Sequence, residues 1–462
     1  MKLKTVLITL SLVLVNAFVF APAALGGGDD DHEHGPADGL VSPAAISDRF
    51  VYRPPGVEHT MSFFYGPFTI PPGQDINRVT VDVPVHGGFL TSVQANVYDA
   101  ATSETPSNQA MHIHHAHWFR TSEDPNDEYY TANLAWVFGT GEERTKGDIN
   151  MRTAAEDGPS YGIHIEAGQP QALIYMLHNK LAQARNVYVA LDVSFVYGTA
   201  DQIQDADGCD ALFMEEGDVC RAGEDFHHLY GKLWGTTFDV PRDFSPQGDG
   251  IYTHPVDIPA EAPERRATDD LGRYWTVSFD GLAIGSAGHL HPNGDTVVIA
   301  NLGPEGSGCE ADLDGDGYPG VTLFYSDKIE DEPLAFPASE EYQMGVTKPG
   351  WRAPVREGDR ITQFGVYHNG EYASYEAMSF TGMYMDRQQP PAPFETDLCT
   401  TDPATAAKAM GSYLVDDPAG DPLVTIRNHD LHDGDGHSHS HGYCGIEGWP
   451  ECNTEVTDPP EG

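Results

Sequence analysis

Positively charged side chains are scarce in this 462-residue sequence. It contains 25 Lys and Arg residues against 71 Asp and Glu residues, a formal net charge of −46. A surface this acidic repels phosphate backbones and anionic membranes, which excludes nucleic acid as a partner. An acidic, lysine-poor surface is typical of proteins that work in high salt, where ions screen the self-repulsion. We therefore expect a halophilic or marine source.

Long hydrophobic runs are missing after the first 26 residues. Residues 1–26 place Lys2 and Lys4 before an apolar run that ends in small residues between Ala23 and Gly28. This layout predicts a signal peptide that is cleaved on export. An uncleaved N-terminal anchor is the alternative, because the run is almost long enough to span a bilayer. We expect a secreted or cell-envelope protein with no other membrane contact.

Cysteine is rare, with six residues, and in an exported chain such residues usually form disulfides. Their positions favour the pairs Cys209–Cys220 and Cys444–Cys452, both close in sequence. Cys309 and Cys399 are then left to tie the second domain to its C-terminal extension. Other connectivities remain open.

Long helical periods are also missing, and short β-rich runs alternate with Gly, Pro and Asp. The sequence predicts an all-β protein with two sequential jelly-roll-like antiparallel β-sandwiches between acidic, His-rich flexible tails. The expected parts are a signal peptide (1–26), an acidic linker with His32 and His34 (27–48), an N-terminal sandwich (49–199), an acidic linker or insertion (200–248), a C-terminal sandwich (249–387), and a Pro- and His-rich extension (388–462).

The densest chemical signal is Met111 to Phe119, which carries His112, His114, His115 and His117 on an expected core strand. Imidazole suits copper, zinc and nickel, so the cluster indicates a transition-metal site without naming the metal. On a regular strand, adjacent side chains face opposite ways. Neighbouring histidines can therefore share a metal only at a bulge or a strand end.

A second signal is the segment Gly288-His289-Leu290-His291-Pro292. The i, i+2 spacing puts His289 and His291 on one face of a strand, close to an expected turn at Asn293-Gly294. Apolar residues before and after the pair argue against a solvated face. We predict a metal site here too.

In their order along the chain, these motifs resemble the copper type II, ascorbate-dependent monooxygenases, the family of peptidylglycine α-hydroxylating monooxygenase and dopamine β-monooxygenase. The resemblance rests on the His114-His115 pair, His178 after an apolar run, the His289-x-His291 pair, and Met378 in a Glu-Met segment before a Met-rich strand. The family has two sequential sandwiches, each of which contributes one copper.

The resemblance implies two coppers per chain. The first would bind His114, His115 and His178, and would store an electron. The second would bind His289, His291 and Met378, and would hydroxylate a C–H bond with dioxygen, using ascorbate or another reductant. The family's methionine after the His-His pair is Ala116 here, followed by His117, which leaves His112 and His117 as alternative ligands. The small-molecule or peptide substrate is not identified.

Weaker metal signals lie elsewhere. Asp312, Asp314 and Asp316 match the first half of a calcium loop, although position twelve is Leu323, so calcium and an acidic surface turn remain alternatives. The tail histidines fit metal scavenging; they are His429, His432, His437, His439 and His441. His227 and His228 are expected in the irregular linker, in contact with solvent.

Two other functional classes remain open. A copper or zinc storage or delivery protein on the same scaffold would explain the His-rich tails. A calcium-stabilised structural envelope protein would explain the acidic turn.

Overall fold

The computed structural model describes most of both predicted sandwiches. The described residues are 53–80, 87–103, 106, 110–121, 134–140, 146–153, 158–240, 251–254, 274–291, 294–330, 342–368, 374–389, 399 and 403–423. The chain in these ranges is almost entirely β-structure, which confirms the predicted all-β sandwich architecture. The signal sequence, both His-containing tails and the Cys444–Cys452 pair lie outside them.

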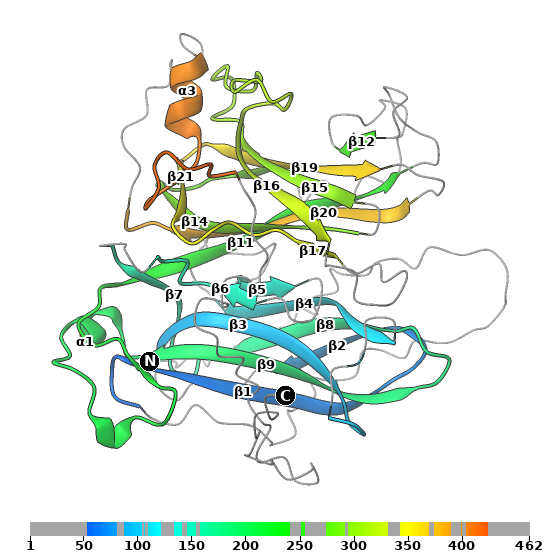
Figure 1. Cartoon of the computed structure of the whole chain (residues 1–462), viewed down its shortest axis with the longest axis vertical. Coiled ribbons are helices and arrows are strands. Elements are labelled where there is room, and N and C mark those ends of the chain that lie inside the picture. The colour runs from blue at the N-terminus through cyan, green and yellow to red at the C-terminus, as the bar shows by residue number, and fades with distance from the viewer. Residues whose placement is uncertain are drawn as a thin grey trace, which may run out of the picture. The chain divides into compact units, whose positions relative to one another are not determined.

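The N-terminal sandwich has two layers of mainly antiparallel strands (Figure 1). One layer has the order β10-β1-β9-β3, with β6 and β7 beside β3: β1 (Val57–Ile70), β3 (Gly88–Asp99), β6 (Lys146–Asp148), β7 (Ser160–Ile165), β9 (Arg185–Tyr197) and β10 (Val219–Cys220). The other has the order β2-β8-β4-β5: β2 (Gly73–Thr80), β4 (Met111–Thr121), β5 (Leu134–Thr140) and β8 (Gln171–Asn179). Side chains from both layers fill one apolar core.

Strand β8 shows why the chain folds this way locally. Its sequence alternates, so that Leu173, Tyr175 and Leu177 are buried while the intervening residues are partly exposed. Because successive side chains point to opposite faces of a sheet, the odd positions enter the N-terminal core. His178 therefore lies on the opposite face of this layer.

The C-terminal sandwich is built in the same manner. One layer has the order β11-β20-β14-β18-β21: β11 (Phe226–Val240), β14 (Gly281–Leu290), β18 (Trp351–Val355), β20 (Ser374–Asp386) and β21 (Tyr413–Leu414). The second has the order β12-β19-β15-β16-β17, with β13 beside β19: β12 (Ile251–His254), β13 (Tyr274–Thr276), β15 (Gly294–Asn301), β16 (Val321–Glu330), β17 (Tyr342–Met344) and β19 (Arg360–His368). A second apolar core lies between them.

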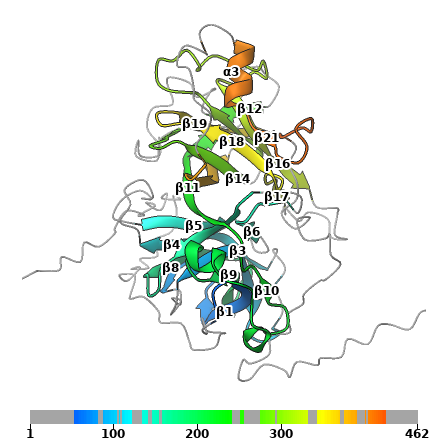
Figure 2. The same ribbon diagram turned by 90° about the vertical axis from the view of Figure 1, so that its left-hand side faces the viewer.

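Strand β11 belongs to both sandwiches (Figure 2). It pairs along most of its length with β20, pairs with β7 at Phe226–His228, and meets β5 at the single pair Gly231 and Trp136. Within the acidic linker or insertion predicted at 200–248, residues 226–240 form this strand. Two histidines and a lysine mask the strand pattern, but Phe226, Leu229 and Leu233 are buried.

Helices are few and short in the described chain. They are α1 (Ala200–Gln204), the 3-10 turn η1 (Ala211–Phe213) and α3 (Pro403–Met410). None of them has the length and apolar character that a membrane crossing requires.

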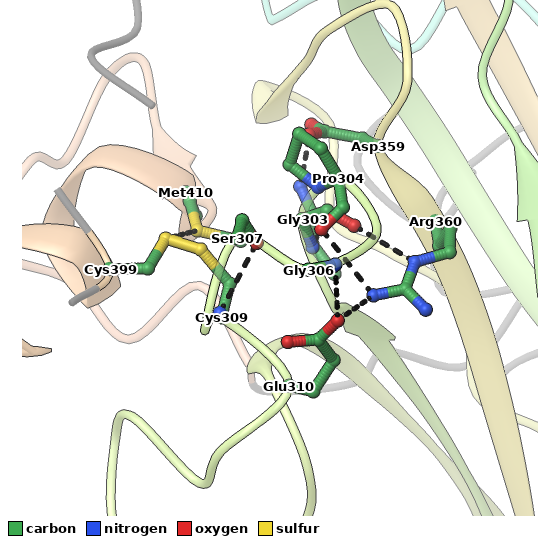
Figure 3. Close-up of a disulfide and its surroundings, with 11 residues drawn as sticks. Gly303, Pro304, Gly306, Ser307, Cys309, Glu310, Asp359, Arg360, Cys399 and Met410 are labelled. Atoms are coloured by element: carbon green, nitrogen blue, oxygen red, sulfur yellow. Dashed lines mark hydrogen bonds and ion pairs between the residues drawn. A yellow bond between two sulfur atoms is a disulfide. The ribbon is translucent and has the colours of Figure 1, made fainter. Parts of the chain in front are cut away.

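Two of the three predicted disulfides are present, Cys209–Cys220 and Cys309–Cys399. The second holds α3 against the loop before β16, where Cys309, Cys399 and Met410 form a small buried cluster (Figure 3). Arg360 pairs with Glu310 in the same loop. The C-terminal extension is thus fastened to the second sandwich, as the sequence predicted.

Replacing Cys309 and Cys399 together by serine should destabilise the protein. The crosslink closes a segment of 90 residues, and its loss frees the unfolded chain, so we expect a decrease of about 3 to 5 kcal/mol in the free energy of unfolding. Urea titration of the oxidised parent and the double variant would measure it. An unchanged midpoint would contradict the assigned role.

Candidate metal centre

The His114-His115 pair lies at a β-bulge. In the ladder between β4 and β8, His112 is opposite His178 and Ile113 is opposite Leu177, but His115, rather than His114, is opposite Met176. The extra residue lets both His114 and His115 leave the core, while Ile113 and Ala116 on either side are fully buried. Neighbouring histidines on a strand can share a metal only at a bulge or a strand end, and His114 and His115 lie at such a bulge.

The second histidine pair lies at the end of β14. His289 is opposite Phe380 on β20 and Leu290 is opposite Ser379, so the ladder, continued by one residue, brings His291 opposite Met378. Residues directly opposite each other share a face of an antiparallel sheet. Met378 therefore lies on the face that carries His289 and His291.

Tyr367 fixes this strand end from β19. The backbone N–H of His291 donates a hydrogen bond of 2.9 Å to the Tyr367 hydroxyl, which in turn donates one of 2.6 Å to the Met378 carbonyl. No local pattern in the sequence marks Tyr367, because its role depends on a pairing between distant strands.

The two histidine pairs meet. The ring centroids of His114 and His291 are 5.2 Å apart, those of His115 and His289 are 4.9 Å apart, and those of His115 and His291 are 5.9 Å apart. One ring nitrogen from each of His114, His115 and His291 lies within 4.8 Å of the other two. A tetrahedral ion with bonds of about 2.0 Å holds its nitrogen ligands about 3.3 Å apart, so the rings would draw together on binding one.

The remaining predicted ligands lie around this group. His178 is 6.5 Å from His114 and His117 is 6.1 Å from His115, measured between ring centroids. The side chain of His112 and the tail histidines lie outside the described part of the structure. The structure therefore unites, in one histidine cluster, residues that the resemblance divides between two sites: His114, His115, His117, His178, His289 and His291.

Burial keeps the cluster uncharged. It lowers the pKa of His114 to about 4, helped by His291 and His178, and lowers that of His117 to about 4 as well. The pKa values of His115 and His289 lie well below the usual range for the same reason, with further repulsion between the rings. At neutral pH these imidazoles therefore offer lone pairs without first losing a proton.

Three ring nitrogens in the cluster are buried and make no hydrogen bond within the described structure: Nε2 of His115, Nδ1 of His117 and Nε2 of His289. A buried polar atom left without a partner costs about 1 to 3 kcal/mol. Neutral, buried imidazole nitrogens that converge from two sheets are the donor set that a transition metal requires. The residues present fit a metal ion.

His227 and His228 differ from their prediction, because on β11 His227 is buried and His228 is half-buried rather than solvated. The N–H of His164 donates to Nδ1 of His228 at 2.9 Å, and Arg120 lies 3.3 Å from Nε2. His227 Nδ1 lies 2.7 Å from an oxygen of Asp386, which is fully buried. Burial alone would lower the pKa of His227, but the hydrogen bond and charge of Asp386 outweigh it and raise the pKa.

Replacing Asp386 by asparagine should therefore destabilise the protein more at pH 6 than at pH 9. A raised folded-state pKa contributes stability that is fully present below the unfolded value of 6.5 and is lost as the pH rises through the folded value. Urea titrations of parent and variant at both pH values would measure the difference. Equal losses at the two pH values would show that the charge of His227 contributes nothing.

The acidic turn keeps its three carboxylates together. Oxygens of Asp312, Asp314 and Asp316 lie within 4.8 Å of one another. They also accept bonds from their own loop, such as those from Gly315 N–H to Asp312 and from Thr322 N–H to Asp314. Leu323 is fully buried and offers no ligand. Calcium and a self-bonded acidic turn therefore remain alternatives here.

Comparison with known proteins adds no family. No family model matches the chain, and no curated protein does. Among solved structures, the STIV MCP aligns with a TM-score of 0.23 and 9% identity over 71% of this chain and 97% of its own. Bacillus subtilis oxalate decarboxylase aligns with a TM-score of 0.11 and 10% identity over 76% and 79%, and hazelnut (Corylus avellana) vicilin with 0.13 and 8% over 74% and 83%. Scores this low carry no argument about function.

Proposed function

We propose that this chain is an exported copper-dependent oxidoreductase that hydroxylates a C–H bond with dioxygen and an external reductant. The observation that carries the proposal is the histidine cluster, in which neutral imidazoles from β4 and from the end of β14 meet. Zinc and nickel also accept imidazole ligands. The thioether of Met378, on the same face as His289 and His291, favours copper, because soft sulfur ligands select Cu(I).

The protein's own residues have separable roles in this proposal. His114, His115 and His291 would hold a copper ion, because their ring nitrogens lie within 4.8 Å of one another, and His178, His289 and Met378 would be further ligands beside them. Bound copper would supply one-electron chemistry and activation of dioxygen. Burial of His115, His117 and His289 keeps their rings neutral and keeps bulk water away from them. Tyr367 holds the backbone of His291 against that of Met378 and so fixes the spacing of these two ligands.

Oxygen consumption tests the proposal. Full-length protein loaded with copper should consume dioxygen in the presence of ascorbate, and mass spectrometry should find at least one more copper per chain than in the variant His115→Ala/His289→Ala. The variant keeps both His-rich tails, so the comparison isolates the cluster. Equal copper contents in parent and variant would refute the proposal.

A copper store or carrier on the same scaffold is the second candidate, favoured by the histidine-rich tails. Such a protein would show the same difference in copper content between parent and variant. It would consume no dioxygen beyond the background of free copper with ascorbate. The two measurements together therefore separate the candidates.

A further inference from the structure

Trp136 lies where the two sandwiches meet, in a slot formed by glycines. It is on β5 and pairs with Gly231 of β11, and only 5% of its surface is exposed. A Cβ atom at Gly231 would lie 2.7 Å from the six-membered ring of Trp136, and one at Gly382 of β20 would lie 2.8 Å from Cη2 of the same ring. Real Cβ atoms do not approach other atoms this closely, and at Gly231 the carbonyl oxygen of Trp136 is closer still, at 2.6 Å, so a side chain at either position would displace Trp136.

The conformation of the backbone does not explain these glycines. Neither Gly231 nor Gly382 has a positive φ, so both could be alanine if space allowed. The absence of a side chain at both positions instead leaves room for the indole of Trp136. The indole lies against β11 and β20, the strands of these two glycines, and stacks on Tyr384, with ring centroids 5.3 Å apart and an angle of 19° between the planes. The Tyr384 hydroxyl donates a hydrogen bond of 3.0 Å to Val137, next to Trp136.

The opposite edge of the indole reaches the histidine cluster. A Cβ atom at Gly139 would lie 3.1 Å from Nε1 of Trp136 and 2.7 Å from Nδ1 of His117. The indole edge and the imidazole thus share the space that a side chain at Gly139 would occupy. Trp136 and His117 therefore lie on either side of Gly139.

The glycine slot also lies on the strand pair that carries the β14 histidines. On β20, Gly382 is two residues from Phe380, which is opposite His289, and four residues from Met378. Gly382 itself is opposite Ala287 on β14. One rigid side chain from the N-terminal sandwich thus rests on the strand pair that carries His289 and His291.

We propose that Trp136 is a positioning residue that sets the spacing between the β4 histidines and the β14 histidines. This inference rests on the proposed metal centre, since it assigns a role to a side chain beside that centre. The indole is wide and has only two side-chain torsions, which makes it a stiff spacer. A shift of the indole would move the two halves of the ligand set apart without removing a ligand.

A rescue experiment tests this role. Gly382→Ala places a methyl group against Cη2, an atom that phenylalanine at position 136 lacks. We expect Gly382→Ala to lower copper affinity at least tenfold, measured by competition with a chelator, and Gly382→Ala/Trp136→Phe to recover most of that loss. Trp234→Phe is the matched control. Trp234 is a buried tryptophan of the C-terminal core, 3% exposed, and its replacement should leave copper affinity unchanged.

Several results would overturn the inference. They are an unchanged affinity in Gly382→Ala, a double variant no better than Gly382→Ala, and a loss of affinity in Trp234→Phe as large as in Gly382→Ala. If Gly382→Ala does not fold, the single variant Trp136→Phe tests the inference. Cu(II) bound to this variant should give an EPR spectrum that differs from that of the parent. An identical spectrum together with an equal copper affinity would refute a positioning role for Trp136. Failure of the parent to bind copper would instead refute the proposed function.

Discussion

Replacing His115 and His289 together by alanine is expected to abolish tight copper binding while leaving the metal-free protein as stable as the parent. Each residue belongs to a different sandwich, and their rings are 4.9 Å apart. Loss of a residue that only orients a metal ligand typically costs 10- to 100-fold in affinity, so loss of two ligands should exceed about 100-fold. Competition with a copper chelator would measure the change.

The metal-free double variant is expected to keep its stability because two ring nitrogens that lack a hydrogen bond are removed. Nε2 of His115 and Nε2 of His289 are buried without a hydrogen bond in the described structure, which costs about 1 to 3 kcal/mol each. Removing them offsets the cavities that alanine leaves, so we expect a net change within about 1 kcal/mol. A fall of several kcal/mol would show that the two rings serve the core rather than a metal.

His59→Ala is the matched control for both measurements. His59 lies in the N-terminal sandwich far along the chain from the cluster, and its Nδ1 is 2.6 Å from an oxygen of Asp218. Its loss should lower stability by roughly 1 to 3 kcal/mol and leave copper affinity unchanged. The His115→Ala/His289→Ala variant should therefore lose copper affinity and keep its stability, whereas His59→Ala should lose stability and keep its copper affinity.

The metal-free protein is expected to lose stability steeply between pH 6.5 and pH 4. Burial lowers the pKa of His114 and of His117 from 6.5 to about 4. The unfolded chain then binds more protons than the folded chain across this window, so the free energy of unfolding falls with falling pH. The loss is about 3 kcal/mol for each of these two residues. His115 and His289 shift in the same direction.

The variant His117→Leu isolates one of these contributions. Urea titration of the metal-free parent and variant at pH 7 and pH 4 should show a loss on acidification that is about 3 kcal/mol smaller in the variant. The many carboxylates titrate alike in both proteins, so the comparison cancels them. An equal loss in parent and variant would show that His117 is protonated at its ordinary pKa and is not held neutral by burial.

Most of the fold could be predicted from sequence because its signals are local. The strict alternation in β8 and the apolar runs around β14 and β15 need only the two-residue period of a strand. The pair Cys309–Cys399 followed by elimination. Strand β11 was missed because His227, His228 and Lys232 hide its pattern, and its partners β7 and β20 lie far away in sequence.

The individual histidines of the cluster could also be singled out from the sequence, but their meeting could not be predicted. The bulge that directs His114 and His115 out of the core was recognised as a condition for shared binding. Contact between His114 and His291 depends on how β4 and β14 are brought together through β5, β11 and β20, which no short segment encodes. Trp136 was missed for the same reason, since its slot is made by glycines on three strands.

The central claim is that one metal centre takes ligands from both sandwiches. Diffraction from copper-loaded crystals, with anomalous scattering recorded at the copper edge, tests this most directly. We predict copper within about 2.2 Å of ring nitrogens from both β4 and the segment His289–His291, in one continuous histidine cluster. Copper bound only by the tail histidines, or by β4 histidines with His289 and His291 turned away, would contradict the account.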